Sequence, residues 1–181
     1  NFYGNAETYY ENGEYKRRTV NALKVLAIPC DVSIIGYDNK VTNTLRLWTA
    51  EPADEDIPQG ESFTEYLNFV RNITHGLYPA DTTENGKLLR LRQQYFLVSA
   101  GLQSALRAHY RKYKTYDNLP DHYVFQLNDT HPIMAIPELM RLLMDEHDYG
   151  WDKAYEIATK CFAFTNHTVM AEALEKWPCH Y

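Results

Sequence analysis

The sequence predicts an α/β fold whose N-terminal part is rich in β-hairpins. Residues 1–50 alternate polar and apolar side chains around turn residues, whereas residues 61–181 contain helical patterns separated by two short apolar runs. The chain has 181 residues, of which 45% are apolar and 23% charged, and this is enough for one sizeable core. We therefore expect residues 1–181 to belong to one domain, β-rich over 1–50 and helical with parallel strands over 61–181.

Charge and cysteine usage argue against several classes of protein. A net charge of −6 argues against a nucleic-acid binder, which normally carries a basic surface. No apolar run approaches the roughly 20 residues that span a bilayer, and no signal segment opens the chain. Cys30, Cys161 and Cys179 form no CxxC pair, so we expect a reducing, cytoplasmic compartment rather than disulfides or a zinc site. The chain begins at Asn1 and stops at "WPCHY", which indicates a piece of something longer.

The first 50 residues read as β-structure. The stretch "AETYYENGEYKRRTV" surrounds Asn12-Gly13, the strongest short pattern for a hairpin. The β-branched runs that follow are expected to break at Pro29 and at the turn Gly36–Asn39. Residues 51–60, "EPADEDIPQG", are acidic and carry proline and glycine, which predicts a loop.

Two helices are predicted next. Ser62 and Glu65 form a capping box, and an apolar stripe follows it at helical spacing, made of Phe63, Leu67, Val70 and Ile73. After a turn at 76–81, residues 86–113 read as one long helix that is buried over part of its length through Leu89, Phe96, Leu102 and Leu106. The basic residues at its end (Arg111, Lys112 and Lys114) are more typical of a helix cap than of a ligand site.

The C-terminal third alternates strands and helices. We expect a buried strand at 123–127, helices at 136–147 and 151–160, a second strand at 161–165 and a helix at 170–177. Strands joined by helical crossovers are parallel, so their carboxyl ends share one edge of the sheet, where α/β proteins bind ligands.

Polar residues follow both strands. "NDTHP" places Asn128, Asp129 and His131 after the first strand, and "TNHT" places Asn166 and His167 after the second. These side chains should therefore converge on one pocket. Taken alone, Thr130 and Thr168 are better explained as helix N-caps, but caps do not account for two histidines.

The chemistry of that pocket favours a sugar. A metal ion is possible, since His and Asp are good ligands, but no His-x-x-x-His spacing occurs. No glycine-rich phosphate loop and no nucleophile elbow is present. The neutral donors and acceptors with one carboxylate suit sugar hydroxyls, and the 15 tyrosines offer flat faces for sugars or for ordinary strand packing.

Several stretches resemble the α-glucan phosphorylase family, the glycogen and maltodextrin phosphorylases. They are "VTNTLRLWTAE", "LYPADTTENGKLLRLRQQYFLVSA", "LNDTHP", "IPELMRLLMDE", "WDKAYEI" and "TNHTVMAEALEKWP", in the family's order and over nearly the whole chain. "KTYDNLPDHYVFQLNDTHP" looks most like the simpler bacterial members.

The resemblance implies a partial Rossmann-like N-terminal domain of a glycosyltransferase-B enzyme. Such enzymes cleave terminal α-1,4-glucosidic bonds with inorganic phosphate and release glucose 1-phosphate with retention. They use pyridoxal 5′-phosphate, whose lysine belongs to a domain absent from this chain, so the chain alone should bind no cofactor and be inactive. The full-length enzyme is expected to be a cytoplasmic homodimer that acts on α-1,4-glucan and has no metal, nucleic-acid or membrane partner.

Residue roles follow from the same resemblance. His167 matches the histidine whose side chain reaches the glucosyl 6-hydroxyl and whose carbonyl faces the cation-like sugar. Asp129 and His131 match residues that line the pocket beside the anomeric carbon. Substrate-binding positions are the gating aspartate, its basic neighbour and the residues that flank His167, namely Asp81, Arg90, Asn166 and Thr168.

Two departures from the family pattern weaken particular expectations. Thr82 and Thr83 stand where many members have asparagine and an aromatic residue, which puts the gate contact to glucose in doubt. Arg107 is followed by Ala108 where AMP-regulated members have adjacent arginines, which puts nucleotide activation in doubt.

Two other functions stay open. A glycosyltransferase that uses a sugar nucleotide needs a nucleotide-binding second domain. A non-catalytic glucan-binding module is supported by the tyrosines of the first hairpin (Tyr9, Tyr10 and Tyr15).

Overall fold

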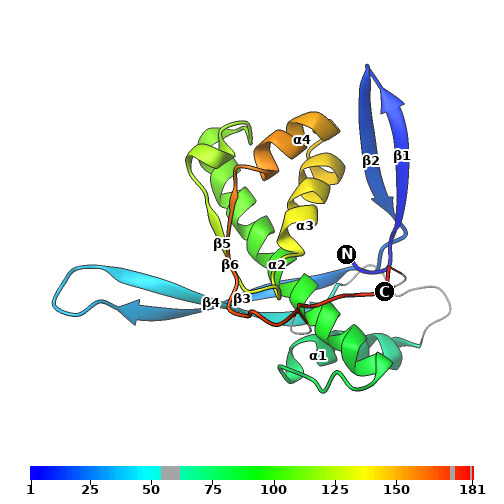
Figure 1. Ribbon diagram of the computed structural model, residues 1–181, viewed down its shortest axis with the longest axis vertical. Coiled ribbons are helices and arrows are strands. Elements are labelled where there is room, and N and C mark those ends of the chain that lie inside the picture. The colour runs from blue at the N-terminus through cyan, green and yellow to red at the C-terminus, as the bar shows by residue number, and fades with distance from the viewer. Residues whose placement is uncertain (54–61, 172–173, 180) are drawn as a thin grey trace. The chain divides into compact units, whose positions relative to one another are not determined.

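The computed structural model describes residues 1–53, 62–171, 174–179 and 181 (Figure 1). It is a mixed α/β structure with small two-stranded sheets. Its strands are β1 (Asn5–Glu11), β2 (Glu14–Val20), β3 (Val25–Ile35), β4 (Thr42–Pro52), β5 (Phe125–Asn128) and β6 (Phe162–Thr165). Its helices are α1 (Phe63–His75), α2 (Glu84–Tyr113), α3 (Ala135–Arg141) and α4 (Trp151–Ala158), with a 3₁₀ turn η1 (Leu119–Asp121) and a π-helical turn η2 (Leu142–Glu146).

The chain forms two compact units. Unit 1 contains residues 1–3 and 22–93, and unit 2 contains residues 4–21 and 94–181. Each is described by itself below. Among the described residues, no helix has both the length and the apolar character needed to cross a membrane.

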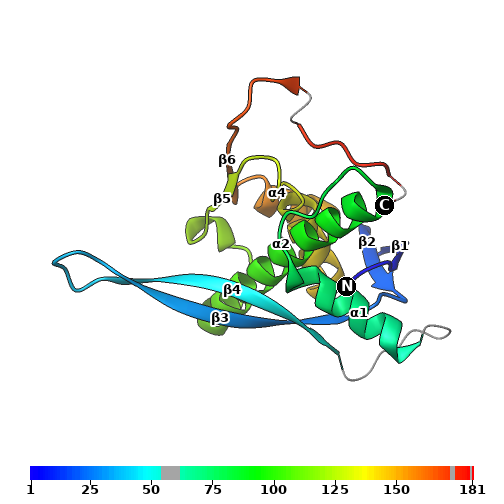
Figure 2. The same cartoon turned by 90° about the horizontal axis from the view of Figure 1, so that it is seen from below.

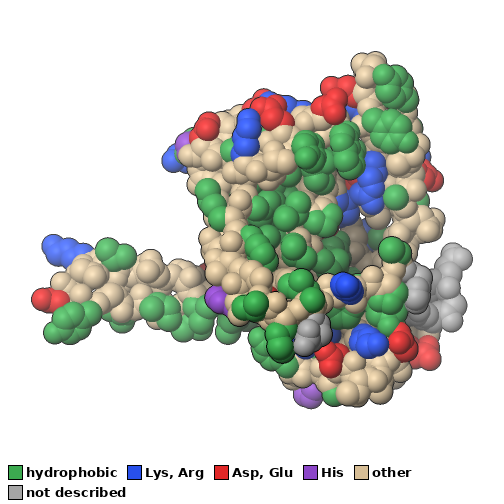
Figure 3. Space-filling view, viewed as in Figure 1, with side chains coloured by type: hydrophobic (Ala, Val, Ile, Leu, Met, Phe, Trp, Pro, Cys, Tyr) green, Lys and Arg blue, Asp and Glu red, His purple; other side chains and the backbone are tan. Residues whose placement is uncertain are grey.

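Unit 1 is built from the long antiparallel hairpin β3–β4 and helix α1 (Figure 2). The hydroxyl of Tyr66, from α1, accepts a hydrogen bond from the Ala53 amide at 2.9 Å and donates one to the Lys24 carbonyl, also at 2.9 Å. This buried tyrosine therefore ties the helix to the ends of both strands. Away from α1 the hairpin exposes apolar side chains such as Ile35 and Tyr37 (Figure 3).

Two expectations for unit 1 were wrong in detail. Pro29 does not break β3 but pairs with Trp48, because a two-stranded ladder leaves outward-facing positions that need no N–H group. Residues 51 and 52 belong to β4 rather than to a loop, while residues 54–60 of that expected loop lie outside the described residues.

The start of α1 confirms the capping box. The Ser62 hydroxyl accepts from the Glu65 amide at 3.2 Å, and the Glu65 carboxylate accepts from the Ser62 amide at 3.0 Å. The buried stripe differs from the expected one, because Tyr66 is buried with Val70 and Ile73 whereas Phe63 is exposed.

Unit 2 begins with the hairpin β1–β2, whose turn is the expected Asn12-Gly13 pair. Both residues have positive φ, 53° and 84°, as a tight turn between twisted strands requires. The hairpin is fixed to η2 by side chains. Lys16 contacts Asp148 at 2.7 Å, Arg17 contacts Asp145 at 2.8 Å, and the Thr19 hydroxyl also donates to Asp145.

The core of unit 2 lies between α2, α3, α4 and the β5–β6 pair (Figure 1). Side chains from all these elements are buried together, among them Leu106, Leu127, Leu139, Leu143 and Ile157. The expected burial of α2 is confirmed for Phe96, Leu102 and Leu106, while Leu89 is half-buried. The strand expected at 123–127 is shorter and less buried, since only Leu127 of β5 is fully enclosed.

The expected helix at 170–177 is wrong for the residues that the structure describes. Residues 170 and 174–177 are not helical, and only Ala171 has a 3₁₀ geometry. Met170 and Leu174 are exposed, so the apolar side chains at these two positions are not packed in a way that would stabilise a short helix.

Candidate functional site

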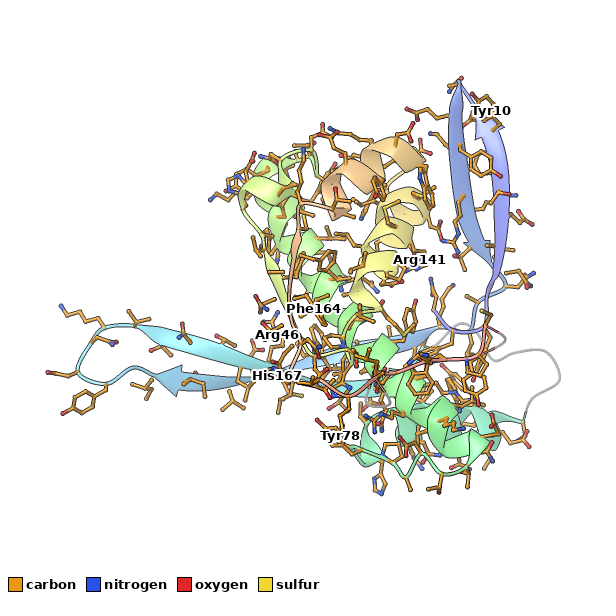
Figure 4. All side chains as sticks on the ribbon, in the orientation of Figure 1. Tyr10, Arg46, Tyr78, Arg141, Phe164 and His167 are labelled. Carbon is orange, nitrogen blue, oxygen red and sulfur yellow. The ribbon has the colours of Figure 1, made fainter. Side chains whose placement is uncertain are left out.

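Strands β5 and β6 lie side by side and run parallel, as the sequence predicted. Their register pairs Leu127 with Phe164 and Asn128 with Thr165. One further bond, from the Asp129 amide to the Thr165 carbonyl at 2.8 Å, continues the ladder past the strand end. The polar segments that follow the strands therefore leave the sheet from the same edge (Figure 4).

A left-handed residue ends β5. Asp129 has φ of 64°, a conformation that aspartate tolerates better than most residues, and its carboxylate accepts from the Thr130 amide at 2.7 Å. This turn directs the next residue inward, since Thr130 is buried.

The two strand ends are linked by His167. Its Nε2 atom lies 2.5 Å from the side-chain oxygen of Asn128. Because an amide oxygen only accepts, Nε2 is the protonated ring nitrogen in this contact. Asn128 thus fixes both the ring orientation and the tautomer of His167.

Asn166 and Thr168 close a local turn around His167. The side-chain amide of Asn166 donates to the backbone carbonyl of Thr168 at 2.8 Å and accepts from the backbone N–H of Thr168 at 3.0 Å. Neither threonine is a helix cap in the described structure. The N-cap of α3 is Met134 rather than Thr130, and Thr168 precedes no described helix.

Glu175 contacts residues in the turn that follows β5 and one residue of α2. Its carboxylate accepts from the side-chain amide of Gln94 at 2.9 Å and from the Thr130 hydroxyl at 3.5 Å. The Nδ1 atom of His131 lies 3.2 Å from the same carboxylate, without the alignment of a hydrogen bond.

The two remaining predicted positions lie in unit 1. Arg90, on α2, contacts Asp81 at 3.6 Å and lies over the ring of Tyr78, 6.0 Å from its centre. The structure thus groups Asp81 with Arg90 in unit 1 and the five other predicted residues in unit 2.

Thr83, one of the two departures from the family pattern, has a local role. Its hydroxyl accepts from the Gly86 amide at 3.1 Å and so caps the start of α2. Gly86 is needed there for a steric reason, because a Cβ atom at this position would lie 1.8 Å from the Ala80 carbonyl oxygen.

This close approach gives a stability prediction with a control in the same helix. In the full-length protein, Gly86→Ala should lower the stability of α2 by about 1–3 kcal/mol, because the Ala80 backbone has to move. Gly101→Ala adds its methyl group to open space and should stabilise α2 by about 0.5–1 kcal/mol. Hydrogen exchange of α2 amides measures both effects, and a stabilising Gly86→Ala would contradict the prediction.

The edge of β5 and β6 offers hydrogen-bonding groups of several kinds. It carries two imidazoles, two amide side chains, hydroxyls and the carboxylates of Asp129 and Glu175, a set suited to a polyhydroxylated ligand. Within the described ranges, His, Cys, Asp and Glu side chains form no cluster of three or more that could hold a metal ion.

Two residues of this edge have roles that sequence reasoning missed. Asn128 was expected near the pocket, but not as the partner that orients His167. Glu175 was hidden in a segment expected to be helical, and no pattern links it to His131, 44 positions away. The only hint in the sequence was that residues 128–131 contain several side chains that can donate hydrogen bonds but one carboxylate, that of Asp129, to accept them.

Comparisons with known proteins place these features in a family. The family described as carbohydrate phosphorylase matches residues 1–181. Glycogen phosphorylase of Bacillus subtilis is 41% identical over 179 residues, which is 99% of this chain and 22% of that protein. The Synechocystis glycogen phosphorylase is 44% identical over 181 residues, 96% of this chain and 21% of that protein. The muscle form from Ovis aries is 42% identical over 194 residues, 99% of this chain and 22% of that protein. The chain thus spans about a fifth of the length of the curated relatives it matches.

Proposed function

This chain belongs to the carbohydrate phosphorylase family, and we propose that it is an internal part of the N-terminal domain of an α-glucan phosphorylase. The full-length enzyme, with a glycosyltransferase-B fold, cleaves terminal α-1,4-glucosidic bonds with phosphate and releases glucose 1-phosphate with retention. The observation that carries this proposal is the parallel pairing of β5 and β6, which brings "NDTHP" and "TNHT" to one edge in a chain that matches the family throughout.

In this proposal, His167 is the residue nearest the reacting sugar. Its ring, held by Asn128, binds the 6-hydroxyl of the glucosyl unit, and its backbone carbonyl faces the positive charge that develops at the anomeric centre. A fixed carbonyl dipole stabilises that charge without reorganising during the reaction. Asp129 and His131 shape the pocket and hydrogen-bond within it.

Four other residues are assigned to substrate binding. Asn166 and Thr168 hold the turn that presents His167, as their mutual hydrogen bonds support. Asp81 and Arg90 act on the loop that gates the cleft, and their contact gives that loop a fixed charge pair. Thr83 argues against a direct contact between this loop and glucose, because its hydroxyl caps α2.

We propose that the lysine that holds pyridoxal phosphate is not among the residues of this chain. Lys16 is the buried lysine among the described residues, and its amine is held by Asp148 at 2.7 Å. We therefore assign the cofactor to a part of the enzyme beyond these residues, where its 5′-phosphate would supply acid–base chemistry. The enzyme is proposed to be a cytoplasmic homodimer.

Incubation of the full-length protein with maltoheptaose and inorganic phosphate tests this function. We expect glucose 1-phosphate, seen as the α-anomer by NMR, in an amount equal to the glucosyl units lost from the glucan. Omission of phosphate is the control and should stop the release. Transfer from a sugar nucleotide without phosphorolysis would replace the proposal with the glycosyltransferase alternative.

A further inference from the structure

Glu175 is a largely buried glutamate that has no role in the mechanism proposed above. Its side chain is 13% exposed, a low value for this residue type, and it lies in the segment that follows β6 and His167. A carboxylate so little exposed is costly to bury unless it has hydrogen-bond partners. Its contacts therefore show which parts of unit 2 it holds together.

The carboxylate of Glu175 joins three segments of unit 2. One of its oxygens accepts a hydrogen bond from the side-chain amide of Gln94, on α2, at 2.9 Å, and the other accepts from the Thr130 hydroxyl at 3.5 Å. Thr130 is itself buried, in the turn that follows β5. Glu175 thus connects the segment that carries His167 to the turn that carries His131.

The ring of His131 faces this carboxylate with one of its two nitrogens. The Nδ1 atom is buried, has no hydrogen-bond partner in the described part of the chain, and lies 3.2 Å from the Glu175 oxygen that accepts from Gln94. The His131 side chain as a whole is 41% exposed. Because Nδ1 is buried, the exposed part of the ring lies on the side away from Glu175, where a ligand can reach it.

An electrostatic argument places the hydrogen on the neutral His131 ring. A neutral imidazole carries its hydrogen on one nitrogen and a lone pair on the other. A lone pair on Nδ1 would be repelled by a carboxylate oxygen 3.2 Å away, whereas an N–H dipole is attracted to that oxygen even without ideal alignment. Glu175 therefore favours the tautomer with the hydrogen on Nδ1, which leaves Nε2 as an acceptor.

We propose that Glu175 is a positioning residue, which fixes the turn after β5 and presents Nε2 of His131 as a hydrogen-bond acceptor to a sugar hydroxyl. A sugar hydroxyl donates as well as accepts, so its pocket needs acceptors. The neutral ring of His167, whose Nε2–H faces Asn128, likewise leaves its Nδ1 atom as an acceptor. This inference rests on the proposed function, because that function places a glucosyl unit at the edge of β5 and β6.

Steady-state kinetics of the full-length enzyme test the role of Glu175. Glu175→Gln keeps the length of the side chain but removes its charge. It should lower kcat for phosphorolysis of maltoheptaose roughly five-fold or more and change KM by less than about two-fold, because the residue acts on the reacting unit and not on the rest of the glucan. Lys176, the exposed neighbour in the same segment, is the matched control, and Lys176→Gln should keep the wild-type rate. An unchanged kcat in Glu175→Gln, or an equal loss in both variants, would overturn the proposal.

A double-mutant cycle separates positioning from a general effect on folding. If Glu175 acts through His131, Glu175→Gln should have almost no further effect on kcat, less than about two-fold, once His131 is replaced by alanine. Losses that multiply in the double variant would mean that Glu175 supports only the fold, and they would overturn the proposal.

Two substitutions of His131 test which ring nitrogen meets the sugar. The side-chain amide of glutamine can take the place of Nε2, whereas that of the shorter asparagine can replace only Nδ1. His131→Gln should therefore keep a kcat roughly five-fold or more above that of His131→Asn. The reverse order would overturn the assigned tautomer and the proposal with it. Because Glu175 is unchanged in both variants, this comparison holds even if substitutions of Glu175 prevent folding.

Ring-nitrogen NMR of the full-length protein, isotope-labelled at histidine, separates this inference from the proposed function. The His131 resonances are those that disappear in His131→Gln. At a pH where the ring is neutral, they should show the hydrogen on Nδ1 in the wild type and a shift toward the other tautomer in Glu175→Gln. A hydrogen on Nε2 in the wild type would overturn the inference. A protein that shows the Nδ1 tautomer but forms no glucose 1-phosphate would refute the proposed function and leave the orientation of His131 by Glu175 standing.

Discussion

Replacing His167 with alanine is expected to lower kcat/KM for phosphorolysis by about two orders of magnitude or more, equivalent to a few kcal/mol of transition-state stabilisation. Asn128 holds the ring in one orientation, so the ring is preorganised for its contact with the sugar. Alanine removes the ring and leaves the backbone carbonyl in place. Steady-state rates of glucose 1-phosphate formation by the full-length enzyme measure the loss.

Two further variants show whether that loss is specific. Asn128→Ala should cause a smaller loss, of roughly ten-fold, because the ring remains but loses the partner that orients it. His75, an exposed residue in the last turn of α1, provides a histidine control, and His75→Ala should keep the wild-type rate. A near-normal rate for His167→Ala would remove His167 from the mechanism.

The second large effect is on stability, at a buried charge network in unit 2. Glu138 is 3% exposed and accepts from Arg141 at 2.8 and 2.9 Å and from the Ser99 hydroxyl at 2.6 Å. Burial opposes the charge of Arg141, but its hydrogen bonds with Glu138 outweigh that effect and raise its pKa. Burial first, and then the Glu138 carboxylate, raise the pKa of Tyr95 to about 12.

Glu138→Gln should therefore destabilise unit 2 by about 2–3 kcal/mol, because it removes the charged partner of two hydrogen bonds from the largely buried guanidinium of Arg141, which keeps only the longer contacts with Glu146 at 3.2 Å and Asp145 at 3.7 Å. Hydrogen exchange of residues 135–146 in the full-length protein, followed in increasing urea, measures this change. Glu156→Gln is the matched control. Within the part of the chain that the structure describes, that exposed carboxylate contacts Lys153 on its own helix and Lys160 in the turn after it, so its loss should cost less than about 1 kcal/mol. Equal costs for the two substitutions would contradict the assigned role of Glu138.

Local sequence rules were sufficient for the turn of the first hairpin, the cap of α1 and the pairing of β5 with β6. Asn12-Gly13 needs positive φ at both positions, and only one tight hairpin turn satisfies that requirement. The capping box at Ser62 is a contact over three residues, so it can be read directly from spacing. The parallel pairing of β5 and β6 followed from the helical crossover between them, because handedness and connection length leave few alternatives.

Features that depend on burial or on distant partners could not be predicted. "MAEALEKW" has residues that favour a helix, but propensity stabilises a short helix only when one of its faces is packed, and here Met170 and Leu174 are exposed. The contact between His131 and Glu175 depends on the path of the chain after β6, which no periodicity encodes. The ring orientation of His167 likewise depends on a side chain in another strand.

The most direct test of this account asks whether His167 holds the glucosyl 6-hydroxyl. Rates of glucan elongation are compared for glucose 1-phosphate and 6-deoxyglucose 1-phosphate, with the wild-type enzyme and with His167→Ala. If the ring binds that hydroxyl, its removal slows the wild type by roughly ten-fold or more and has almost no further effect on the variant. If both enzymes lose the same factor, the edge of β5 and β6 does not hold the reacting sugar in the way proposed.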